Sequence, residues 1–381
     1  MIWKKSKTPI IPLQVYYYFF PVALITLVGL GDSIYLVVSH YRVYTDIGYQ
    51  SFCAISRALN CDTVSQSPYA ILAGVPVSVW GIMGYGFFIT LLAFARLQKA
   101  MHRRVWTLLL LISLGFSIYS MILAVISTFY IKSYCIMCIL SYGVNLLLLF
   151  FTWLIRNRFE CEPILKAICL DIRYLLKFPK AMGGFLTIFT AGTALMLVFF
   201  PPYWKIHLPE LSDETSTGLT QEGHPWIGAE HPVLEIVEFS DYQCFQCRKM
   251  HFFLRRMIKA YPDKIQLVHR HFPMDHTVNP IVREPFHTGS GRLALVALAA
   301  AKTNRFWEMN DVVFDISKQT GAVNIRKIAE QAGIAFDDIR QVFQDKQLRQ
   351  KLKQDIQAGL DYKLTGTPGF VINETVYMGQ I

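Results

Sequence analysis

The chain has 381 residues, of which 53% are hydrophobic and only 17% are charged, and its mean hydropathy is +0.34. Soluble domains carry about 25% charged residues, so this composition excludes an ordinary cytosolic enzyme and a disordered protein. The net charge of +10 comes from residues 1–200, which hold 16 Lys and Arg against 6 Asp and Glu, whereas residues 201–381 hold 21 of each. Because this excess interrupts long apolar runs, as the cytoplasmic loops of membrane proteins do, no nucleic-acid partner is expected.

Five apolar stretches are long enough, at about 1.5 Å per residue, to cross a hydrocarbon core of about 30 Å. The first follows three lysines, as a signal peptide would, but it is too long for an apolar signal core and no small-residue cleavage site follows it. We therefore expect it to be a retained anchor. The five stretches run from Tyr16 to Val38, Val77 to Leu97, Val105 to Tyr130, Cys135 to Ile155 and Gly184 to Phe200.

The basic residues at the ends of these stretches predict the orientation. With a cytoplasmic N-terminus, thirteen Lys and Arg fall on the cytoplasmic side and three on the other, which is the bias typical of cytoplasmic loops. An odd number of spans then places everything after Phe200 on the extracytoplasmic side. The thirteen are Lys4, Lys5, Lys7, Arg96, Lys99, Arg103, Arg104, Arg156, Arg158, Lys166, Arg173, Lys177 and Lys180, and the three are Arg42, Arg57 and Lys132.

The last third of the chain has the composition of a soluble domain, preceded by a polar stretch that we expect to be a linker. A buried-strand pattern from Val233 to Phe239 leads into a helix that begins near Cys244, and a second strand follows from Ile265 to Arg270. Residues 291–362 are rich in Ala, Leu, Gln and Lys and predict helices, and a short strand follows Pro368. This order predicts an α/β domain with a helical insertion.

The eight cysteines divide between the two sides of the membrane. Six fall on the extracytoplasmic side, which is the oxidising side in bacteria, and they form three close pairs. Cys161 and Cys169 fall in the cytoplasm and lie about 12 Å apart along a helix, too far for a disulfide within it, so we expect free thiols. The three pairs are Cys53 with Cys61, Cys135 with Cys138, and Cys244 with Cys247.

Cys244 and Cys247 form a C-x-x-C motif at the start of a helix that follows a buried strand. This geometry brings the two sulfurs within bonding distance, and the helix N-terminus favours a thiolate on the first cysteine. The pattern is typical of thioredoxin-like redox domains. A zinc site is the alternative, but it would need two further ligands and the nearest candidate pair lies in the membrane half, so no metal is expected.

The sequence VEFSDYQCFQC around this motif, residues 237–247, resembles the active-site segment of DsbA-like thioredoxin-fold oxidases. The segment HRHFP, residues 269–273, is similar to the next strand of that family, and GTPGF, residues 366–370, is similar to its cis-proline loop. The family's domain usually continues into a closing helix, whereas this sequence ends at Ile381.

The resemblance covers residues 233–381 and implies a thioredoxin fold. It also implies that Cys244 and Cys247 are catalytic, because they occupy the positions of the family's dithiol. The supporting residues that it implies are Glu238 as the buried acid behind the dithiol, and Thr367 and Pro368 in the loop that packs against it.

Cys135 and Cys138 open the fourth apolar stretch, where one helical turn holds the pair at membrane depth within reach of a lipid-soluble oxidant. Packing of two cysteines in a helix interface is the alternative. The loop pair Cys53 and Cys61 lies between the first two spans, on the same side as both C-x-x-C motifs, and this arrangement favours redox chemistry.

The membrane half resembles the vitamin K epoxide reductase family from about Tyr16 to Ile155. The matching segments are Cys53 with CDTVSQS at 61–67, GVPVSVWG at 74–81, and CIMC at 135–138 with Tyr142 a turn later. The resemblance implies four helices around a quinone, with Ser67 in a short re-entrant segment over the pocket and Tyr142 facing the quinone ring. Bacterial members are often fused through a fifth span to a thioredoxin-like domain.

The expected fold class is therefore multi-domain: an α-helical membrane bundle, with a four-helix core and a fifth linking helix, followed by a soluble α/β thioredoxin-fold domain with a helical insertion. The expected boundaries are 1–158 for the membrane domain, 159–205 for a cytoplasmic loop and the fifth helix, 206–232 for the linker, and 233–381 for the thioredoxin-fold domain.

These features predict an inner-membrane thiol-disulfide oxidoreductase that oxidises reduced secreted or periplasmic proteins and uses ubiquinone or menaquinone. Electrons would pass from Cys244 and Cys247 through the loop cysteines to the membrane C-x-x-C pair and the quinone. An outward-directed reductase or isomerase is one alternative, for which Cys161 and Cys169 make a poor cytoplasmic entry. A membrane-tethered chaperone is another, and it leaves six paired cysteines unexplained.

Asp32 is an ionisable residue inside the first apolar stretch. A charge at membrane depth is costly and often marks a functional site, such as a proton path. The alternative is that Asp32 lies at a polar surface of the bundle.

Overall fold

A computed structural model of the chain describes residues 16–55, 58–96, 104–159, 162–205, 215–316, 326, 330 and 341–379. The chain divides into two compact units. One comprises residues 1–43 and 50–202, and the other comprises residues 44–49 and 203–381.

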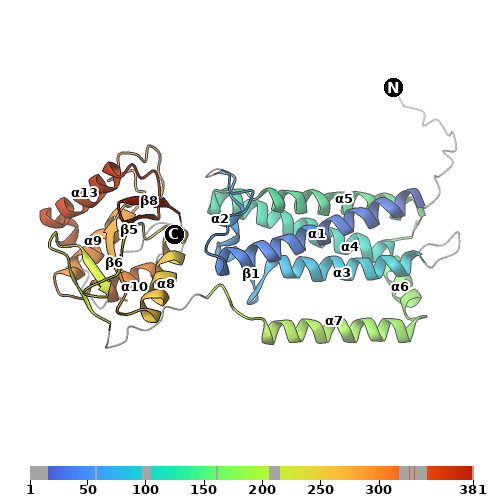
Figure 1. The fold of residues 1–381 in the computed structure, drawn as a ribbon. Helices are drawn as coiled ribbons and strands as arrows, with labels where there is room; N and C mark the ends of the chain where they lie inside the picture. The colour runs from blue at the N-terminus through green and yellow to red at the C-terminus, as the bar shows by residue number, and fades with distance from the viewer. Residues whose placement is uncertain are drawn as a thin grey trace, which may run out of the picture. The chain divides into compact units, whose positions relative to one another are not determined.

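Five helices of the first unit are long and apolar enough to cross a membrane. Four of them form a bundle with one apolar core, to which Phe88, Trp106 and Leu148 contribute fully buried side chains. The fifth, α7 (Pro179–Phe199), lies outside this core beside α3, where its Phe185 and Phe189 contact Phe87 (Figure 1). The four helices of the bundle are α1 (Tyr16–Thr45), α3 (Val77–Arg96), α4 (Trp106–Ile126) and α5 (Ile136–Phe159). The expected four-helix core with a fifth helix is confirmed.

Small residues let the helices of the bundle approach closely, as is typical of membrane helices. A Cβ added at Gly29 on α1 would lie 2.6 Å from the ring of Tyr85 on α3 and 2.9 Å from Val144 on α5. A Cβ at Gly81 on α3 would lie 2.5 Å from the Ser33 hydroxyl on α1. The absence of these side chains therefore sets how tightly α1, α3 and α5 pack.

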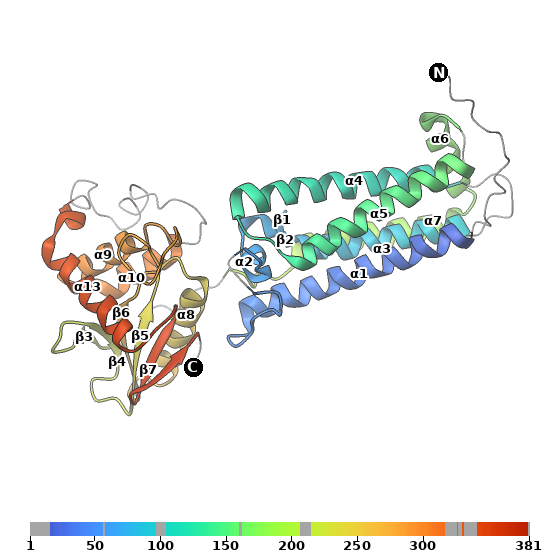
Figure 2. The same cartoon turned by 90° about the horizontal axis from the view of Figure 1, so that it is seen from above.

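Short elements gather at one end of the bundle, and α6 (Ile164–Leu175) lies at the other (Figures 1 and 2). A two-stranded hairpin lies just before α3. Its turn residues Ala73 and Gly74 both have positive φ, as a tight two-residue turn requires. A π-helical turn, η2 (Ser127–Ile131), extends α4 at this same end. The short elements are α2 (Cys61–Ser65), η1 (Pro68–Ala70), β1 (Ile71–Leu72) and β2 (Val75–Pro76).

The second unit is built on a six-stranded mixed sheet in the order β3-β4-β6-β5-β7-β8. The two central strands, β5 and β6, run parallel and are joined by α8 (Phe245–Ala260), and the remaining pairs are antiparallel. The strands are β3 (Thr217–Leu219), β4 (Pro225–Gly228), β5 (Leu234–Ser240), β6 (Ile265–His271), β7 (Gly369–Ile372) and β8 (Thr375–Met378).

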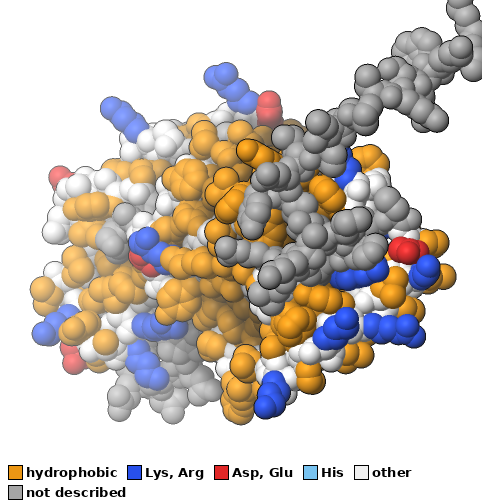
Figure 3. All heavy atoms as spheres, turned by 90° about the vertical axis from the view of Figure 1, so that its right-hand side faces the viewer, with side chains coloured by type: hydrophobic (Ala, Val, Ile, Leu, Met, Phe, Trp, Pro, Cys, Tyr) orange, Lys and Arg blue, Asp and Glu red, His pale blue; other side chains and the backbone are white. Residues whose placement is uncertain are grey.

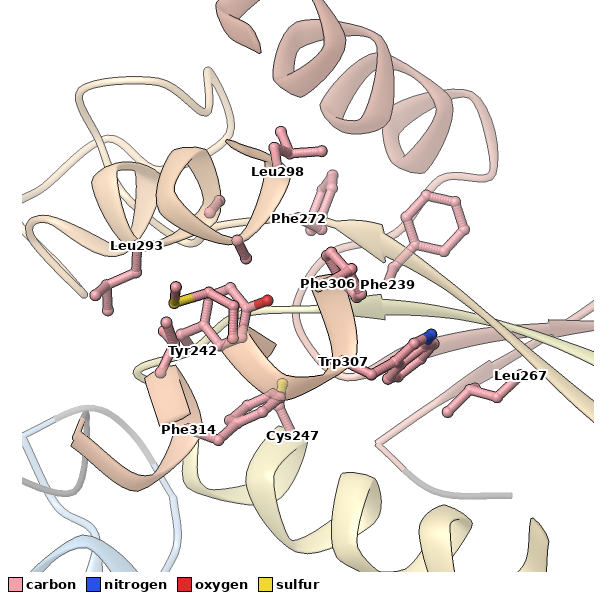
Figure 4. Packing of buried hydrophobic residues seen from close by; sticks show 14 of the residues in the cluster. Phe239, Tyr242, Cys247, Leu267, Phe272, Leu293, Leu298, Phe306, Trp307 and Phe314 are labelled. Carbon is pink, nitrogen blue, oxygen red and sulfur yellow. The ribbon is translucent and has the colours of Figure 1, made fainter. Parts of the chain in front are cut away.

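Helices pack on this sheet around one apolar core. The core joins Phe239 of β5, Leu267 of β6 and aromatic side chains of α10, and Cys247 points from α8 into this cluster (Figure 4). The predicted helical insertion contains α9 (Ser290–Ala301), α10 (Phe306–Ile316) and α13 (Lys346–Asp361). The expected soluble α/β domain with a helical insertion is thus confirmed.

The expected linker over residues 206–232 differs from the structure, because residues 217–228 form β3 and β4. These strands continue the sheet beyond β6. They are only three and four residues long and contain Gly218, Pro225 and Gly228, so they lack the alternating apolar pattern that identifies a strand in a sequence. Residues 206–214 lie outside the described residues.

We expect Gly29→Ala to lower the free energy of unfolding of the bundle in detergent by about 1–3 kcal/mol, as overpacking of a close contact does. The Tyr85 ring cannot swing aside freely, since its hydroxyl donates a 2.7 Å hydrogen bond to Asn145. Gly31→Ala is the matched control, because nothing lies within 4 Å of the added Cβ, and it should change stability by no more than about 1 kcal/mol. Equal thermal unfolding midpoints for the two variants would contradict the packing argument.

Candidate functional site

Three cysteines form a buried cluster at the end of the bundle that carries the short elements. Cys53 and Cys61 are joined by a disulfide, with Cα atoms 5.6 Å apart. Cys135 packs against this disulfide, and the three side chains are 0%, 4% and 3% exposed respectively. The structure thus brings together the loop pair and the first cysteine of the membrane C-x-x-C motif.

Backbone hydrogen bonds hold the loop against the start of α5. Leu59 and Tyr134 form a parallel bridge, in which the Asn60 N–H donates to the Tyr134 carbonyl at 2.9 Å and the Tyr134 N–H donates to the Ala58 carbonyl at 2.7 Å. The Asn60 side chain also accepts the Thr63 N–H and so caps α2. Cys61 and Cys135 each follow a residue of this bridged segment, so the bridge fixes the position of one sulfur relative to the other.

Cys135 immediately precedes α5, and Cys138 lies in the first turn of that helix. The Cys138 N–H donates to the Cys135 sulfur at 3.2 Å, so Cys135 occupies the position of a helix cap. Both are free cysteines, in contrast to the loop pair. We expected Cys135 to open the helix, and the structure places it one residue before the first helical residue.

A cavity of about 330 Å³ lies inside the bundle, beneath the short elements. The Cys61, Cys135 and Cys138 side chains line it, and so do Ser67 and Tyr142, the two side chains that the sequence analysis proposed for a quinone. Ser67 is 3% exposed, donates to the Val64 carbonyl at 2.7 Å and precedes η1. The volume falls in the usual range for small-molecule pockets, about 300–1,000 Å³.

The second dithiol lies at the start of α8. Cys244 is the N-cap residue, its sulfur accepts the Cys247 N–H at 3.2 Å, and its thiol donates to the Thr367 carbonyl at 3.4 Å. The Thr367–Pro368 peptide bond is cis, as in the loop that this segment resembles. Cys247 is fully buried and Cys244 is 9% exposed, so Cys244 is the more accessible of the two thiols.

The electrostatic surroundings separate the two thiols of this motif. Burial opposes ionisation of Cys244, but the hydrogen bond from the Cys247 side chain and the charge of His287 outweigh it, so the pKa of Cys244 lies below its ordinary value. Burial, together with the hydrogen bond and charge of Cys244, raises the pKa of Cys247 well above its ordinary value. Cys244 is therefore the thiolate-forming member of the pair.

Glu238 is fully buried on β5, at a position where β6 and β7 flank it with His269 and Phe370. The Nδ1 atom of the buried His269 ring lies 3.4 Å from the Glu238 carboxylate. The burial of this side chain agrees with the expectation of a buried acid at this position.

Family comparisons cover both halves of the chain. Residues 20–153 match the vitamin K epoxide reductase family, and residues 235–381 match the DSBA-like thioredoxin domain. This chain joins a vitamin K epoxide reductase domain to a DSBA-like thioredoxin domain. The resemblances drawn from the sequence motifs are confirmed.

Individual proteins resemble parts of the chain. The Na(+)/H(+) antiporter NhaA 3 of Salinispora tropica is 25% identical over 146 residues, which are 38% of this chain and 21% of the antiporter. The chain thus spans about a fifth of the length of the curated relatives it matches. A thioredoxin-like oxidoreductase from Silicibacter pomeroyi covers 42% of this chain over 84% of its own length, with 22% identity and a TM-score of 0.36. A periplasmic thioredoxin-like protein from Salmonella enterica serovar Typhimurium covers 42% of this chain over 82% of its own length, with 21% identity and a TM-score of 0.33.

The sequence analysis missed a polar chain in the cavity of the vitamin K epoxide reductase domain. The Tyr85 hydroxyl donates to the Asn145 side chain at 2.7 Å, and the Asn145 amide donates to the Ser120 hydroxyl at 2.8 Å. All three residues line the cavity. An asparagine in the middle of an apolar span was the signal that could have revealed this chain, because an amide at membrane depth needs partners.

The sequence analysis also missed His287 of the thioredoxin domain. Its Nδ1 lies 3.0 Å from the Asp241 carboxylate, which accepts the Gln243 N–H in the turn just before Cys244. The charge of His287 lowers the pKa of Asp241 as well as that of Cys244 despite the burial of both groups. Because 42 residues lie between Cys244 and His287, the sequence does not reveal this relation.

We expect His287→Gln to raise the pKa of Cys244, because the amide can still hydrogen-bond to Asp241 but carries no positive charge. Less thiolate then exists at neutral pH, so alkylation of reduced Cys244 slows there and recovers at higher pH. The measurement is the pH dependence of iodoacetamide labelling, with sites assigned by mass spectrometry. His276→Gln, in the same loop beside Asp275, is the control and should leave the profile unchanged. An identical profile in His287→Gln would show that His287 does not tune the dithiol.

Proposed function

We propose that the chain is a quinone-dependent thiol-disulfide oxidoreductase that generates disulfide bonds in extracytoplasmic proteins. The pairing of the two domains supports thiol-disulfide chemistry. The observation that carries the proposal is the position of Cys135, which packs on the Cys53–Cys61 disulfide and also lines the cavity with Cys138.

The first stage oxidises a protein substrate. A substrate thiolate attacks the sulfur of Cys244 in the Cys244–Cys247 disulfide, and Cys247 leaves and takes a proton. A second substrate thiol then displaces Cys244, whose lowered pKa makes it a good leaving group. The substrate has lost two electrons and gained a disulfide, and the thioredoxin domain is left as a dithiol.

The second stage passes these electrons into the membrane. The thioredoxin dithiol reduces the Cys53–Cys61 disulfide, and the loop dithiol then reduces a Cys135–Cys138 disulfide by exchange. Cys61 and Cys135 both line the cavity and belong to one buried cluster. This packing provides the contact that the second exchange needs. Fusion in one chain gives the first exchange an effective concentration in the millimolar range.

The cavity suits a quinone in volume, in its largely aromatic and aliphatic lining and in its few polar groups. When bound there, a quinone supplies the two-electron acceptor. We assign Ser67 and Tyr142 to hold it, with ubiquinone and menaquinone both compatible with the pocket chemistry. Cys138, one helical turn before Tyr142 on α5, is the thiol that faces the acceptor, and its oxidation together with Cys135 releases two electrons and two protons.

We place the chain in the bacterial inner membrane with the thioredoxin domain outside the cytoplasm. Of the basic residues that support this orientation, Arg156, Arg158, Lys166, Arg173 and Lys180 lie on α5, α6 and α7, and Lys177 lies in the turn between α6 and α7. In Figure 3, which faces the end of the bundle near α6, hydrophobic side chains occupy much of the middle of the view and Lys and Arg side chains lie toward its edges. Lys4, Lys5, Lys7, Arg57, Lys99, Arg103 and the thiol of Cys161 lie outside the described residues.

The relay predicts distinct effects of two cysteine substitutions on quinone reduction by the purified full chain. With a reduced unfolded protein as donor, Cys138→Ala and Cys53→Ala should each lower the rate by at least about a hundredfold, as loss of an essential nucleophile does. With a small dithiol as donor, Cys53→Ala should keep its activity, because that donor can reach the membrane pair directly. Cys169→Ala is the control and should match the unsubstituted chain, since Cys169 is exposed on α6 and belongs to no pair.

Trapping the redox state of each pair by alkylation separates the relay from its rivals. In Cys138→Ala, the relay leaves Cys244 and Cys247 reduced after they meet substrate. An outward reductase would leave them oxidised in the same variant. A tethered chaperone would reduce no quinone even without substitution.

The proposed topology predicts that Cys169 reacts with a membrane-impermeant maleimide only after intact cells are permeabilised. Cys169 is exposed, so its accessibility depends on the side of the membrane and not on burial. A cysteine introduced by Lys353→Cys, at an exposed position of the thioredoxin domain, should react in intact cells. Labelling of Cys169 from outside would reverse the assignment of sides.

A further inference from the structure

Asp32 on α1 is a buried carboxyl that the relay leaves without a role. It is 5% exposed and lies within the first membrane-spanning helix, where a charge is costly to bury. Its carboxylate accepts a short hydrogen bond from the Ser141 hydroxyl, and its Oδ1 atom has no hydrogen-bond partner among the described residues. The carboxyl oxygen without a hydrogen-bond partner can therefore accept a proton.

Ser141 connects this carboxyl to the cavity. It lies on α5 three residues after Cys138, so the two residues share a helix face, and both line the cavity. Ser33, the neighbour of Asp32 on α1, lines the cavity as well. Asp32 is therefore connected through Ser141 to the cavity that the cysteine pair and Tyr142 line.

The reaction needs a place to hold protons at this depth. Oxidation of the Cys135–Cys138 dithiol forms one S–S bond and releases two electrons and two protons, and reduction of the acceptor to a quinol consumes both electrons and both protons. The thiol that loses a proton and the acceptor oxygen that gains one need not be in contact with each other. The side chains around them are mostly apolar, so they offer few other sites for the proton. A group that takes up a released proton and later returns it shortens the time during which an unpaired charge is present in the cavity.

We propose that Asp32, acting through Ser141, holds one of the two protons that leave the Cys135–Cys138 dithiol and returns it to the quinone oxygen. The Ser141 hydroxyl donates to the Asp32 carboxylate, and this direction allows uptake: as the Ser141 oxygen takes a proton from the cavity side, its own hydroxyl proton passes to Asp32. Return reverses both movements, so Ser141 and Asp32 end each cycle unchanged. Asp32 is a positioning residue for the proton, because it acts through Ser141 and does not touch the reacting atoms. This inference rests on the proposed quinone-linked function.

Other titratable groups also line the cavity, and they define the comparison variants. They come from every helix of the bundle core, and Asp32 differs from them in being a carboxyl joined to the cavity by a hydroxyl. They are His40 on α1, Tyr69 on η1, Tyr85 on α3, Tyr119 on α4, and Cys138 and Tyr142 on α5, with Cys135 just before it.

The decisive experiment counts protons and needs no quinone. The fully reduced full-length chain in detergent is oxidised with ferricyanide, which accepts electrons but no protons, and a pH-indicator dye reports the protons released per chain. The unsubstituted chain should release one proton fewer than Asp32→Asn, in which the amide keeps the size of the side chain but cannot hold the proton. Ser113→Ala is the matched control. It removes a buried hydroxyl that contacts Thr152 at 2.9 Å outside the cavity, and it should release the same number as the unsubstituted chain.

Infrared difference spectra of the same oxidation provide a second measurement. We expect a protonated-carboxyl band that appears on oxidation of the unsubstituted chain and is absent in Asp32→Asn. Equal proton counts in the unsubstituted chain and Asp32→Asn would overturn the inference, and so would a carboxyl band that survives in Asp32→Asn. An extra proton released by His40→Gln would also overturn it, because His40 would then be the group that holds the proton. Should Asp32→Asn fail to fold, Ser141→Ala tests the same connection and should abolish the rapid appearance of the band.

Quinone turnover then distinguishes failure of this inference from failure of the proposed function. Asp32→Asn should lower kcat for a soluble quinone analogue by at least about tenfold while KM stays within about twofold, since proton transfer is affected and binding is not. A kcat equal to that of the unsubstituted chain overturns the role of Asp32 and leaves the relay intact. No quinone reduction by the unsubstituted chain contradicts the relay itself, whereas the proton count still reports on Asp32.

Discussion

The bridge between Leu59 and Tyr134 is the interaction on which the membrane site depends. It ties the loop of the first cysteine pair to the residue just before Cys135, so two segments about 75 residues apart share one hydrogen-bonded edge. The bridge seats the Cys53–Cys61 disulfide on Cys135, and the short elements that follow Cys61 then close the cavity above α5. Without it, a loop between two membrane spans would have no fixed position relative to the C-x-x-C pair.

The same local arrangement occurs twice in this chain. In each C-x-x-C motif the first sulfur accepts the backbone N–H of the second cysteine at 3.2 Å, at the start of α5 in one domain and of α8 in the other. The surroundings differ. Cys244 has a polar loop, His287 and Thr367 beside it, which suits exchange with protein thiols, whereas Cys138 faces a cavity inside a membrane bundle, which suits a lipid-soluble acceptor. A common backbone geometry at the dithiol therefore occurs in two different surroundings.

The sequence was sufficient for the cysteine pairs, the five spans and the order of the α/β elements. These features are local: apolar length predicts a span, and residue spacing predicts which cysteines share a helical turn. The contribution of β3 and β4 to the sheet could not be predicted, because their strands are short and their register with β6 depends on tertiary contacts. The roles of His287 and Asn145 were hidden for a related reason. Each acts on groups that are distant in the sequence, and neither belongs to a recognisable motif.

Proton balance explains why the membrane site needs more than cysteines. Thiol-disulfide exchange moves two electrons between sulfur pairs, and the protons lost by one dithiol are gained by the next, so sulfur chemistry balances itself through every stage up to Cys135 and Cys138. In the relay that we propose, the last step passes electrons from sulfur to an oxygen acceptor in a low-dielectric cavity, where free protons are scarce and separated charges interact strongly. A carboxyl joined to the cavity by a single hydroxyl, as Asp32 is by Ser141, meets that need at the one stage where cysteines alone do not.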